Sequence, residues 1–191
     1  SHCGDDWREC QDHVRERLGL PRWREQRQPA SRYIPRTDPQ NEPPHNVERA
    51  QRLWHEGCDP RGTPAEEYLA SRKLDLPAEL CGTVLRYHPH CPWRTDDEVV
   101  FIPCLLATFT SIADNTVKAV HRIRLDEPQR WPKTERRMLG ETRDAAIKLD
   151  VAGERLCVAE GVETAMAARQ LGFSPVWAAG SARRFLPIPG V

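Results

Sequence analysis

The sequence has no long hydrophobic run and no excess of charge of either sign. Its longest apolar run, residues 101–109, is too short to span a bilayer. Lysine plus arginine and aspartate plus glutamate each number 28, so the net charge is +0 and no global field attracts nucleic acid. Any nucleic-acid binding must therefore depend on a local group of basic side chains. The first twenty residues are charged and lack the apolar core of a secretory signal peptide.

A regular cysteine framework is also absent. The seven cysteines are an odd number, are scattered along the chain and form no Cys-x-x-Cys pair. This distribution favours a reduced protein in the cytoplasm. The chain has no initiator methionine, and it stops at Val191, where we expect another strand. We therefore expect a fragment of a longer protein.

Three helices and a linker are predicted in the first part of the chain. Apolar residues at spacings of three and four predict a helix over residues 5–18, and residues 21–46 hold six of the 17 prolines and predict a linker. A second helix is expected over residues 46–57. Thr63 and Glu66 form a capping-box pattern with Pro64 at the first helical position, which predicts a third helix. Tyr68 and Leu69 are expected to face the core.

The middle part of the chain shows the patterns of β-strands. We expect strands over residues 83–87, 99–109, 116–125 and 145–149, because these segments are apolar or alternate between apolar and polar residues. Pro103 interrupts the second of them and predicts a bulge or an edge position. Asp114-Asn115 is a turn signal, so residues 99–109 and 116–125 should form an antiparallel hairpin.

The last part of the chain changes to a strand–helix–strand pattern. Residues 156–159 and 175–179 predict two short parallel strands, and residues 162–171 predict the helix between them. Ala165, Ala168 and Leu171 are expected to pack on the sheet. Glu160 directly follows the first strand, and chemistry in open α/β sheets occurs at the carboxyl ends of strands. Glu160 is therefore a candidate metal-binding or acid/base carboxylate, although a surface Glu-Gly turn is an equally simple interpretation.

Basic residues are concentrated before this unit. The segment 122–148 carries an excess of three positive charges in an otherwise neutral chain. Arginine binds phosphate through two parallel hydrogen bonds, so this segment could contact polyphosphate or a template strand; the alternative is a solvated sheet face. The candidate residues for binding nucleic acid or nucleotide are Lys118, Arg122, Arg124, Lys133, Arg136, Arg137 and Lys148.

Several motifs in this order resemble the Toprim-domain primases and primase-helicases of phages and plasmids, which are related to DnaG. The most telling is Val-Ala-Glu-Gly-Val-Glu-Thr-Ala at residues 158–165, followed by Leu-Gly at 171–172 and Pro-Val-Trp-Ala at 175–178. Glu-Glu-Tyr-Leu-Ala-Ser-Arg-Lys-Leu at 66–74, Leu-Arg-Tyr-His-Pro at 85–89, His-Arg-Ile-Arg-Leu-Asp at 121–126 and Arg-Arg-Met-Leu-Gly at 136–140 resemble the region before Toprim. The resemblance covers residues 47–191.

The resemblance implies a fold and a division into domains. It implies an α+β N-terminal part followed by the first half of an α/β Toprim domain with a parallel β-α-β unit. Residues 1–20 would be a helix after a truncated zinc-ribbon-like segment, and residues 21–46 the proline-rich linker. Residues 47–150 would resemble the N-terminal subdomain of a primase, and residues 151–191 would be a partial Toprim domain. His2 and Cys3 would be residual zinc ligands, and two ligands alone hold no structural zinc.

The resemblance also implies a function for the parent protein. A primase synthesises RNA primers on single-stranded DNA from ribonucleoside triphosphates by metal-dependent nucleotidyl transfer, in some proteins with a helicase domain or subunit. Glu160 would be the catalytic residue and a ligand of Mg²⁺ or Mn²⁺, with Gly161 and Glu163 as auxiliary residues. The Asp-x-Asp that completes the family's metal site is expected beyond Val191, so the isolated chain should make no primers. Two alternatives remain: a Toprim nuclease of the OLD type, or a non-catalytic nucleic-acid-binding module.

Overall fold

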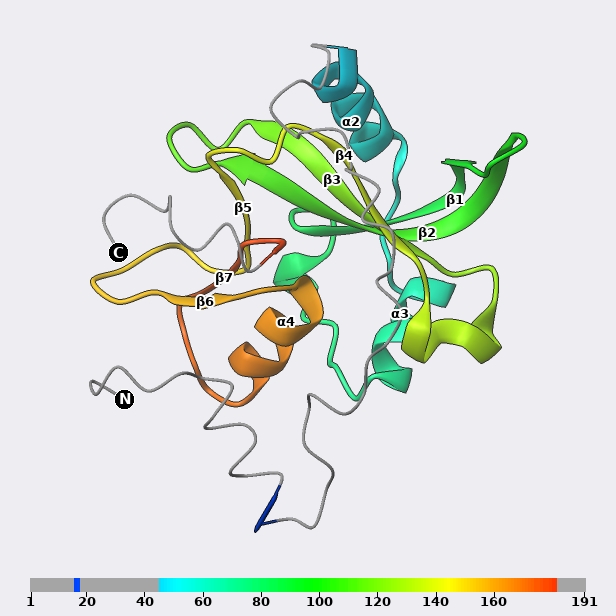
Figure 1. Ribbon diagram of the computed structural model, residues 1–191. Helices are drawn as coiled ribbons and strands as arrows, with labels where there is room; N and C mark the ends of the chain where they lie inside the picture. Colours follow the sequence, from blue (N-terminus) through cyan, green and yellow to red (C-terminus); the bar gives the residue numbers. More distant parts are fainter. Residues whose placement is uncertain (1–15, 18–44, 182–191) are drawn as a thin grey trace. The chain divides into compact units, whose positions relative to one another are not determined.

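A seven-stranded sheet is the centre of the unit that spans residues 39–191 (Figure 1). The structure is a computed structural model that describes residues 16–17 and 45–181, and residues 1–38 form a separate unit. Residues 16 and 17 are helical, within the first predicted helix. The rest of that helix, most of the proline-rich linker, His2 and Cys3 lie outside the described residues.

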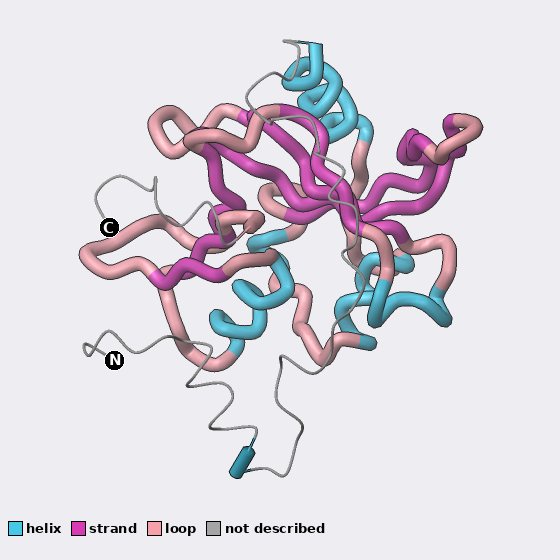
Figure 2. Tube along the Cα trace, viewed as in Figure 1, coloured by secondary structure: helices cyan, strands magenta, loops and turns pink. Residues whose placement is uncertain are grey.

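The strands form one curled sheet (Figure 2). Its strands are β1 (Leu85–Arg94), β2 (Val99–Ser111), β3 (Val117–Arg124), β4 (Arg136–Gly140), β5 (Ala145–Lys148), β6 (Cys157–Ala159) and β7 (Val176–Ala178). Their order is β4-β3-β2-β5-β7-β6, and β1 also pairs with β2. Strand β5 pairs with β2 only at Thr110 and Ser111, beyond the last residue that β1 contacts. The sheet therefore continues from the long β1-β2-β3 region into the short strands β7 and β6.

The predicted hairpin of β2 and β3 is confirmed. The two strands are antiparallel, from Cys104 opposite Arg124 to Thr110 opposite Val117. The register between β1 and β2 shifts between His88 and Cys91, opposite Pro103. Two residues of β1, Pro89 and His90, thus stand opposite the single residue Pro103, so the bulge lies in β1 and Pro103 faces it from the central strand β2.

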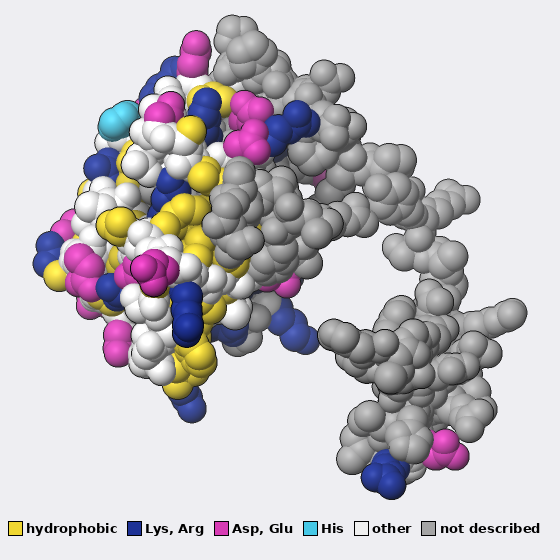
Figure 3. Space-filling model, turned by 90° about the vertical axis from the view of Figure 1, so that its left-hand side faces the viewer, with side chains coloured by type: hydrophobic (Ala, Val, Ile, Leu, Met, Phe, Trp, Pro, Cys, Tyr) yellow, Lys and Arg dark blue, Asp and Glu magenta, His cyan; other side chains and the backbone are white. Residues whose placement is uncertain are grey.

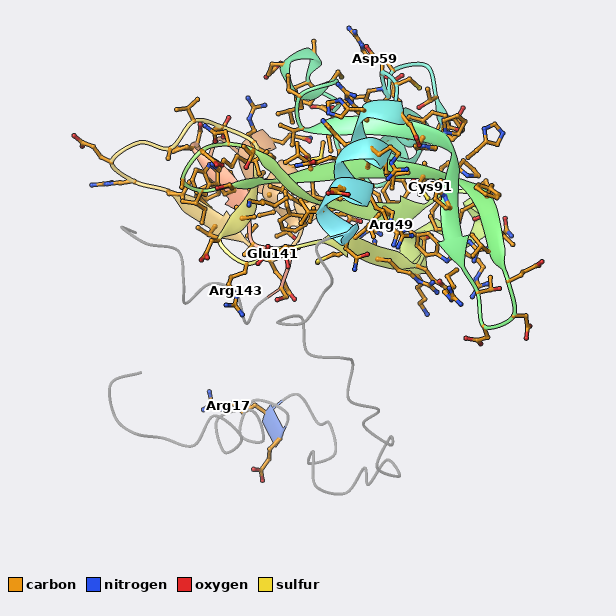
Figure 4. The ribbon with its side chains drawn as sticks, turned by 90° about the horizontal axis from the view of Figure 1, so that it is seen from above. Arg17, Arg49, Asp59, Cys91, Glu141 and Arg143 are labelled. Atoms are coloured by element: carbon orange, nitrogen blue, oxygen red, sulfur yellow. The ribbon has the colours of Figure 1, made fainter. Side chains whose placement is uncertain are left out.

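Helices cover both faces of the sheet (Figure 1). The helix α2 (His45–Glu56) packs on one face through Ala50, Leu53 and Trp54, and in Figure 4 this helix, with Arg49 labelled, crosses over the strands. On the other face lie α3 (Pro64–Ser71), α4 (Val162–Gln170) and two 3-10 helices, Ala78–Leu80 and Pro128–Lys133. Each face has its own apolar cluster, so the sheet is buried on both sides.

The local signals for α3 agree with the structure. The Thr63 hydroxyl accepts a hydrogen bond from the Ala65 N–H at 3.2 Å, and Pro64 opens the helix. The Glu66 carboxylate accepts from the Gly62 N–H at 2.7 Å, one residue earlier than in a regular capping box. Tyr68 and Leu69 are buried as predicted.

Strands β6 and β7 are parallel neighbours joined through α4, as the pattern of the last forty residues predicted. Val158 is opposite Trp177, and Ala159 is opposite Ala178. One detail of the packing prediction is wrong: Leu171 is 78% exposed, whereas Ala165 is fully buried. Helix α4 ends at Gln170, so Leu171 is the C-cap residue and leaves the buried stripe, which Val162 and Met166 complete. The architecture is a mixed α/β fold.

Two strands differ from the sequence prediction because prolines and arginines obscure their pattern. Strand β1 continues past Pro89 and Pro92 to Arg94. Prolines are tolerated there because β2 is the only long strand that pairs with β1 among the described residues. Strand β4 was predicted only as a basic segment, yet it pairs with β3 along its whole length.

Candidate functional site

Glu160 lies at the carboxyl end of β6, in the two-residue connection to α4. Its side chain is exposed, and it has no ion-pair or hydrogen-bond partner within residues 45–181. Its backbone is held: the Gly180 N–H donates to the Glu160 carbonyl at 2.7 Å, and the Ala179 N–H donates to the Ala159 carbonyl at 2.9 Å. The structure thus presents one available carboxylate on a fixed backbone at the tip of a parallel strand pair.

Glu163, three residues further on, has the opposite environment. It lies at the centre of a group that we call the Glu163 cluster, made of Tyr68, Arg72, Arg136 and Glu163. The Tyr68 hydroxyl donates to Glu163 Oε1 at 2.5 Å, and Arg136 Nη2 donates to the same oxygen at 2.7 Å. Arg136 Nε donates to Glu163 Oε2 at 3.3 Å, and Arg72 Nε lies 4.0 Å from Oε1. The Glu163 side chain is only 16% exposed, so this carboxylate is occupied by partners from α3 and β4.

Burial and charge act against each other on the Glu163 cluster. Burial raises the pKa of Glu163, but the hydrogen bonds from Arg136 and Tyr68 and the positive charges of Arg136 and Arg72 outweigh it, and the net effect lowers the pKa. Burial and the hydrogen bond to Glu163 raise the pKa of Tyr68. Glu163 is therefore ionised at neutral pH, and the stability that its pairing contributes is lost only as the pH falls below the ordinary glutamate value of 4.5.

His121, on β3, is a buried histidine on the same face of the sheet. It is 6% exposed, and its Nδ1 has no hydrogen-bond partner among the described residues. Burial lowers its pKa to about 4; the negative charge of Glu163 opposes this shift, and Arg136 and Arg122 add to it. His121 is thus neutral at pH 7, and its uncharged ring keeps this part of the sheet apolar.

This neutral histidine predicts a pH dependence of folding stability. The unfolded chain binds a proton at His121 below pH 6.5 and the folded chain does not, so the free energy of unfolding should fall as the pH drops from 6.5 toward 4. A pKa difference of this size corresponds to a loss of about 3 kcal/mol. Urea unfolding between pH 7.5 and 5 should show a much flatter pH dependence for His121→Leu, because Glu163 contributes only at lower pH.

His55→Leu is the matched control, because His55 is an exposed histidine on α2. That variant should keep the slope of the wild type. Equal slopes for His121→Leu and the wild type would show that His121 takes up a proton in the folded state.

The described residues do not make a complete metal site. No group of three or more His, Cys, Asp or Glu side chains within the described ranges is placed to hold a metal ion. Glu160 supplies one carboxylate, whereas hard cations such as Mg²⁺ need several oxygen ligands. Glu163 is occupied by its arginine and tyrosine partners. Any ion at Glu160 would therefore need ligands from outside the described residues.

One family model matches the chain, over residues 44–149, which is just over half of its 191 residues. The model is described as a domain of unknown function, DUF7146. The chain belongs to this family. No curated protein and no solved structure matches the chain. The DUF7146 region runs from α2 to β5 and includes Tyr68, Arg72 and Arg136, whereas Glu160 and Glu163 follow it. The Glu163 cluster thus connects the DUF7146 region to the β6-α4-β7 unit.

The basic residues predicted to bind nucleic acid do not form a single group. Arg122 and Arg137 lie over the ring of the buried Trp93, at 5.5 Å and 4.6 Å from its centroid, on the α2 face. Arg136 points to the opposite face and joins the Glu163 cluster. The neighbours Arg136 and Arg137 therefore serve different faces because side chains alternate along a strand.

Two more of these residues are paired elsewhere, and two are available. Arg124 forms two hydrogen bonds with Asp126, at 2.6 Å and 2.8 Å. Lys148 donates to the Ser111 carbonyl and the Asn115 side chain and lies 4.9 Å from the Trp177 ring. Lys118 and Lys133 have no ion-pair partner in the part of the chain that the structure describes.

Charges of both signs are mixed on the face of the described residues that Figure 3 shows. Figure 3 shows lysine and arginine interspersed with aspartate and glutamate over one face of the molecule. Within the described ranges, no helix is long and apolar enough to cross a membrane. All five cysteines of the described part are free thiols.

The sequence did not predict that Arg72 belongs to the Glu163 cluster or that His121 lies near it, because no local motif connects either residue to Glu163.

Proposed function

We propose that this chain is the part of a Toprim-type DNA primase that carries the first catalytic carboxylate. The parent protein would synthesise RNA primers on single-stranded DNA by nucleotidyl transfer from ribonucleoside triphosphates. Glu160 is the proposed catalytic residue. The resemblance of residues 47–191 to primases of phages and plasmids is the source of this proposal, and the geometry around Glu160 supports it.

The observation that carries the proposal is the position of Glu160. It follows the carboxyl end of β6, beside the parallel strand β7, where open α/β sheets place their reactive groups. It is exposed and has no partner in the described ranges, whereas Glu163, three residues further on, is held by Arg136. An unpartnered carboxylate at this position is free to bind a cation or a substrate.

We propose a divalent cation as cofactor, on the same grounds as the catalytic role of Glu160. Mg²⁺ or Mn²⁺ would neutralise charge on the triphosphate, and Glu160 would supply one of its ligands. The remaining carboxylates are proposed to come from an Asp-x-Asp beyond Val191. Of the seven candidate basic residues, Lys118 and Lys133 are proposed to contact phosphate, because neither forms an ion pair within the described residues.

The experiment that tests the proposal compares synthesis, cleavage and binding by the full-length parent. Single-stranded DNA is incubated with labelled ribonucleoside triphosphates and Mg²⁺ or Mn²⁺, and the products are separated by length. We expect short RNA primers that disappear when the divalent cation is chelated. Cleavage of the DNA without primers would indicate a nuclease, and binding without either product would indicate a non-catalytic module; each result would overturn the primase proposal.

A further inference from the structure

We propose that Tyr68, Arg136 and Glu163 are positioning residues that fix Glu160 by anchoring the first turn of α4. This inference rests on the proposed function of Glu160. Only two residues, Glu160 and Gly161, connect β6 to α4. The position of Glu160 therefore depends on how firmly each end of this connection is held.

The β6 end is held by the sheet. Ala159 and Glu160 accept backbone hydrogen bonds from Ala179 and Gly180, which follow β7. The connection itself adds little: a side chain placed on Gly161 would meet nothing within 4 Å, so open space surrounds it. Gly161 is also the N-cap residue of α4, and it has no side chain to cap the helix.

The α4 end is therefore held mainly by its own first two residues. Val162 is 1% exposed and packs in the core. Glu163 is fixed by Tyr68 from α3 and by Arg136 from β4, and these two partners also bond to each other, with Arg136 Nη2 donating to the Tyr68 hydroxyl at 3.1 Å. Arg136 Nη1 donates to the Thr134 carbonyl at 2.9 Å, so its planar guanidinium has little freedom.

The opposite end of α4 provides an internal comparison. There Arg169 is bonded to Asp150 at 2.8 Å and to Glu79 at 2.9 Å. These contacts hold the same helix to Asp150, which follows β5, and to the 3-10 helix that contains Glu79, at the end away from Glu160. If ion pairs on α4 served only to stabilise the fold, breaking either pair would have the same consequence for Glu160. The positioning role predicts that only the Glu163 cluster affects it.

The experiment uses the full-length parent with two pairs of variants. Tyr68→Phe removes only the hydroxyl that reaches Glu163, and the ring keeps its edge contact with Trp131, at 5.7 Å between centroids. Its control is Tyr87→Phe, since the Tyr87 hydroxyl bonds to no described residue. Glu163→Gln removes the negative charge of the cluster, and its control is Glu79→Gln, which breaks one of the two ion pairs at the other end of α4.

Two quantities are measured for each variant: hydrogen exchange of the backbone amides of residues 165–167, which donate to the carbonyls of the first turn of α4, and the kcat and KM of primer synthesis. A displacement of about 1 Å at a reacting group can cost about 100-fold in rate. We expect roughly tenfold faster exchange and a kcat lowered by about tenfold in Tyr68→Phe, and larger changes in Glu163→Gln. The KM for single-stranded DNA should stay unchanged, and both controls should behave as the wild type.

The outcomes separate this inference from the proposed function. Unchanged exchange in Tyr68→Phe, or equal changes in the controls, would overturn the positioning role. Faster exchange with an unaltered kcat in the variant would also overturn the positioning role. In each of these cases, primer synthesis by the wild type would leave the primase proposal intact. A wild type that makes no primers would overturn the primase proposal and, with it, the inference that the cluster positions a catalytic residue.

Discussion

Glu160→Gln in the full-length parent is expected to lower primer synthesis by about 100- to 1000-fold, the size of effect seen when one electrostatic contact to the reacting atoms is removed. Glutamine keeps the shape of the side chain but removes the charge that makes Glu160 a candidate ligand for a divalent cation. Folding should be almost unaffected, because the side chain is exposed and forms no hydrogen bond or ion pair with another described residue. Primer synthesis at saturating DNA and nucleotide, together with a urea unfolding curve, measures both effects.

Glu154→Gln is the matched control for this prediction. Glu154 is an exposed glutamate in the connection that precedes β6, so its replacement removes the same charge from the same region of the chain. We expect primer synthesis within twofold of the wild type. A Glu160→Gln parent as active as this control would show that the catalytic site lies elsewhere.

Sequence patterns predicted those parts of the fold that depend on neighbouring residues. The capping residues Thr63 and Glu66 predicted α3, and the alternation after Asn115 predicted the β2–β3 hairpin. Sequence patterns did not predict β4, because its two adjacent arginines show no alternation between apolar and polar residues. The two side chains alternate between the faces of the sheet, which is visible only in the structure. Arg136 lies on one face and Arg137 on the other, and both are partly shielded by partners far away in the chain.

The candidate site shows the same limit. Glu160 could be predicted because its position, directly after a short apolar strand, is itself a local pattern. The environment of Glu163 could not, since Tyr68 is 95 residues away along the chain and had been predicted only as a core residue. The tyrosine is indeed buried, but its hydroxyl reaches Glu163. A local pattern thus predicted the burial of the ring and could not predict the partner of its polar end.

The largest effect on stability is expected for Gly140→Ala, which should lower the free energy of unfolding by about 3–5 kcal/mol. Gly140 has a φ of +104°, which favours glycine. An added Cβ would lie less than 3.0 Å from the Lys118 carbonyl oxygen and from Ala119 Cα. Both are backbone atoms of β3, opposite Gly140 in the sheet, so no flexible side chain can move away. Strand β4 must therefore separate from β3, and Ala50 of α2, whose Cβ would lie 3.0 Å from the new Cβ, adds a further tight contact.

Substitutions of two other glycines separate the two causes of this loss of stability, the unfavourable φ and the steric clash of the new Cβ. Gly62→Ala has the unfavourable φ of +69° but no atom within 4 Å of the new Cβ, so it should cost only about 1–2 kcal/mol. Gly153→Ala has neither problem, because its nearest neighbours are 3.9 Å and 4.0 Å away, and its stability should stay within about 0.5 kcal/mol of the wild type. Urea unfolding of the three variants measures the series. A cost for Gly140→Ala no greater than that for Gly62→Ala would show that β4 can move away from β3 without loss, and that Arg136 is not held rigidly by the sheet.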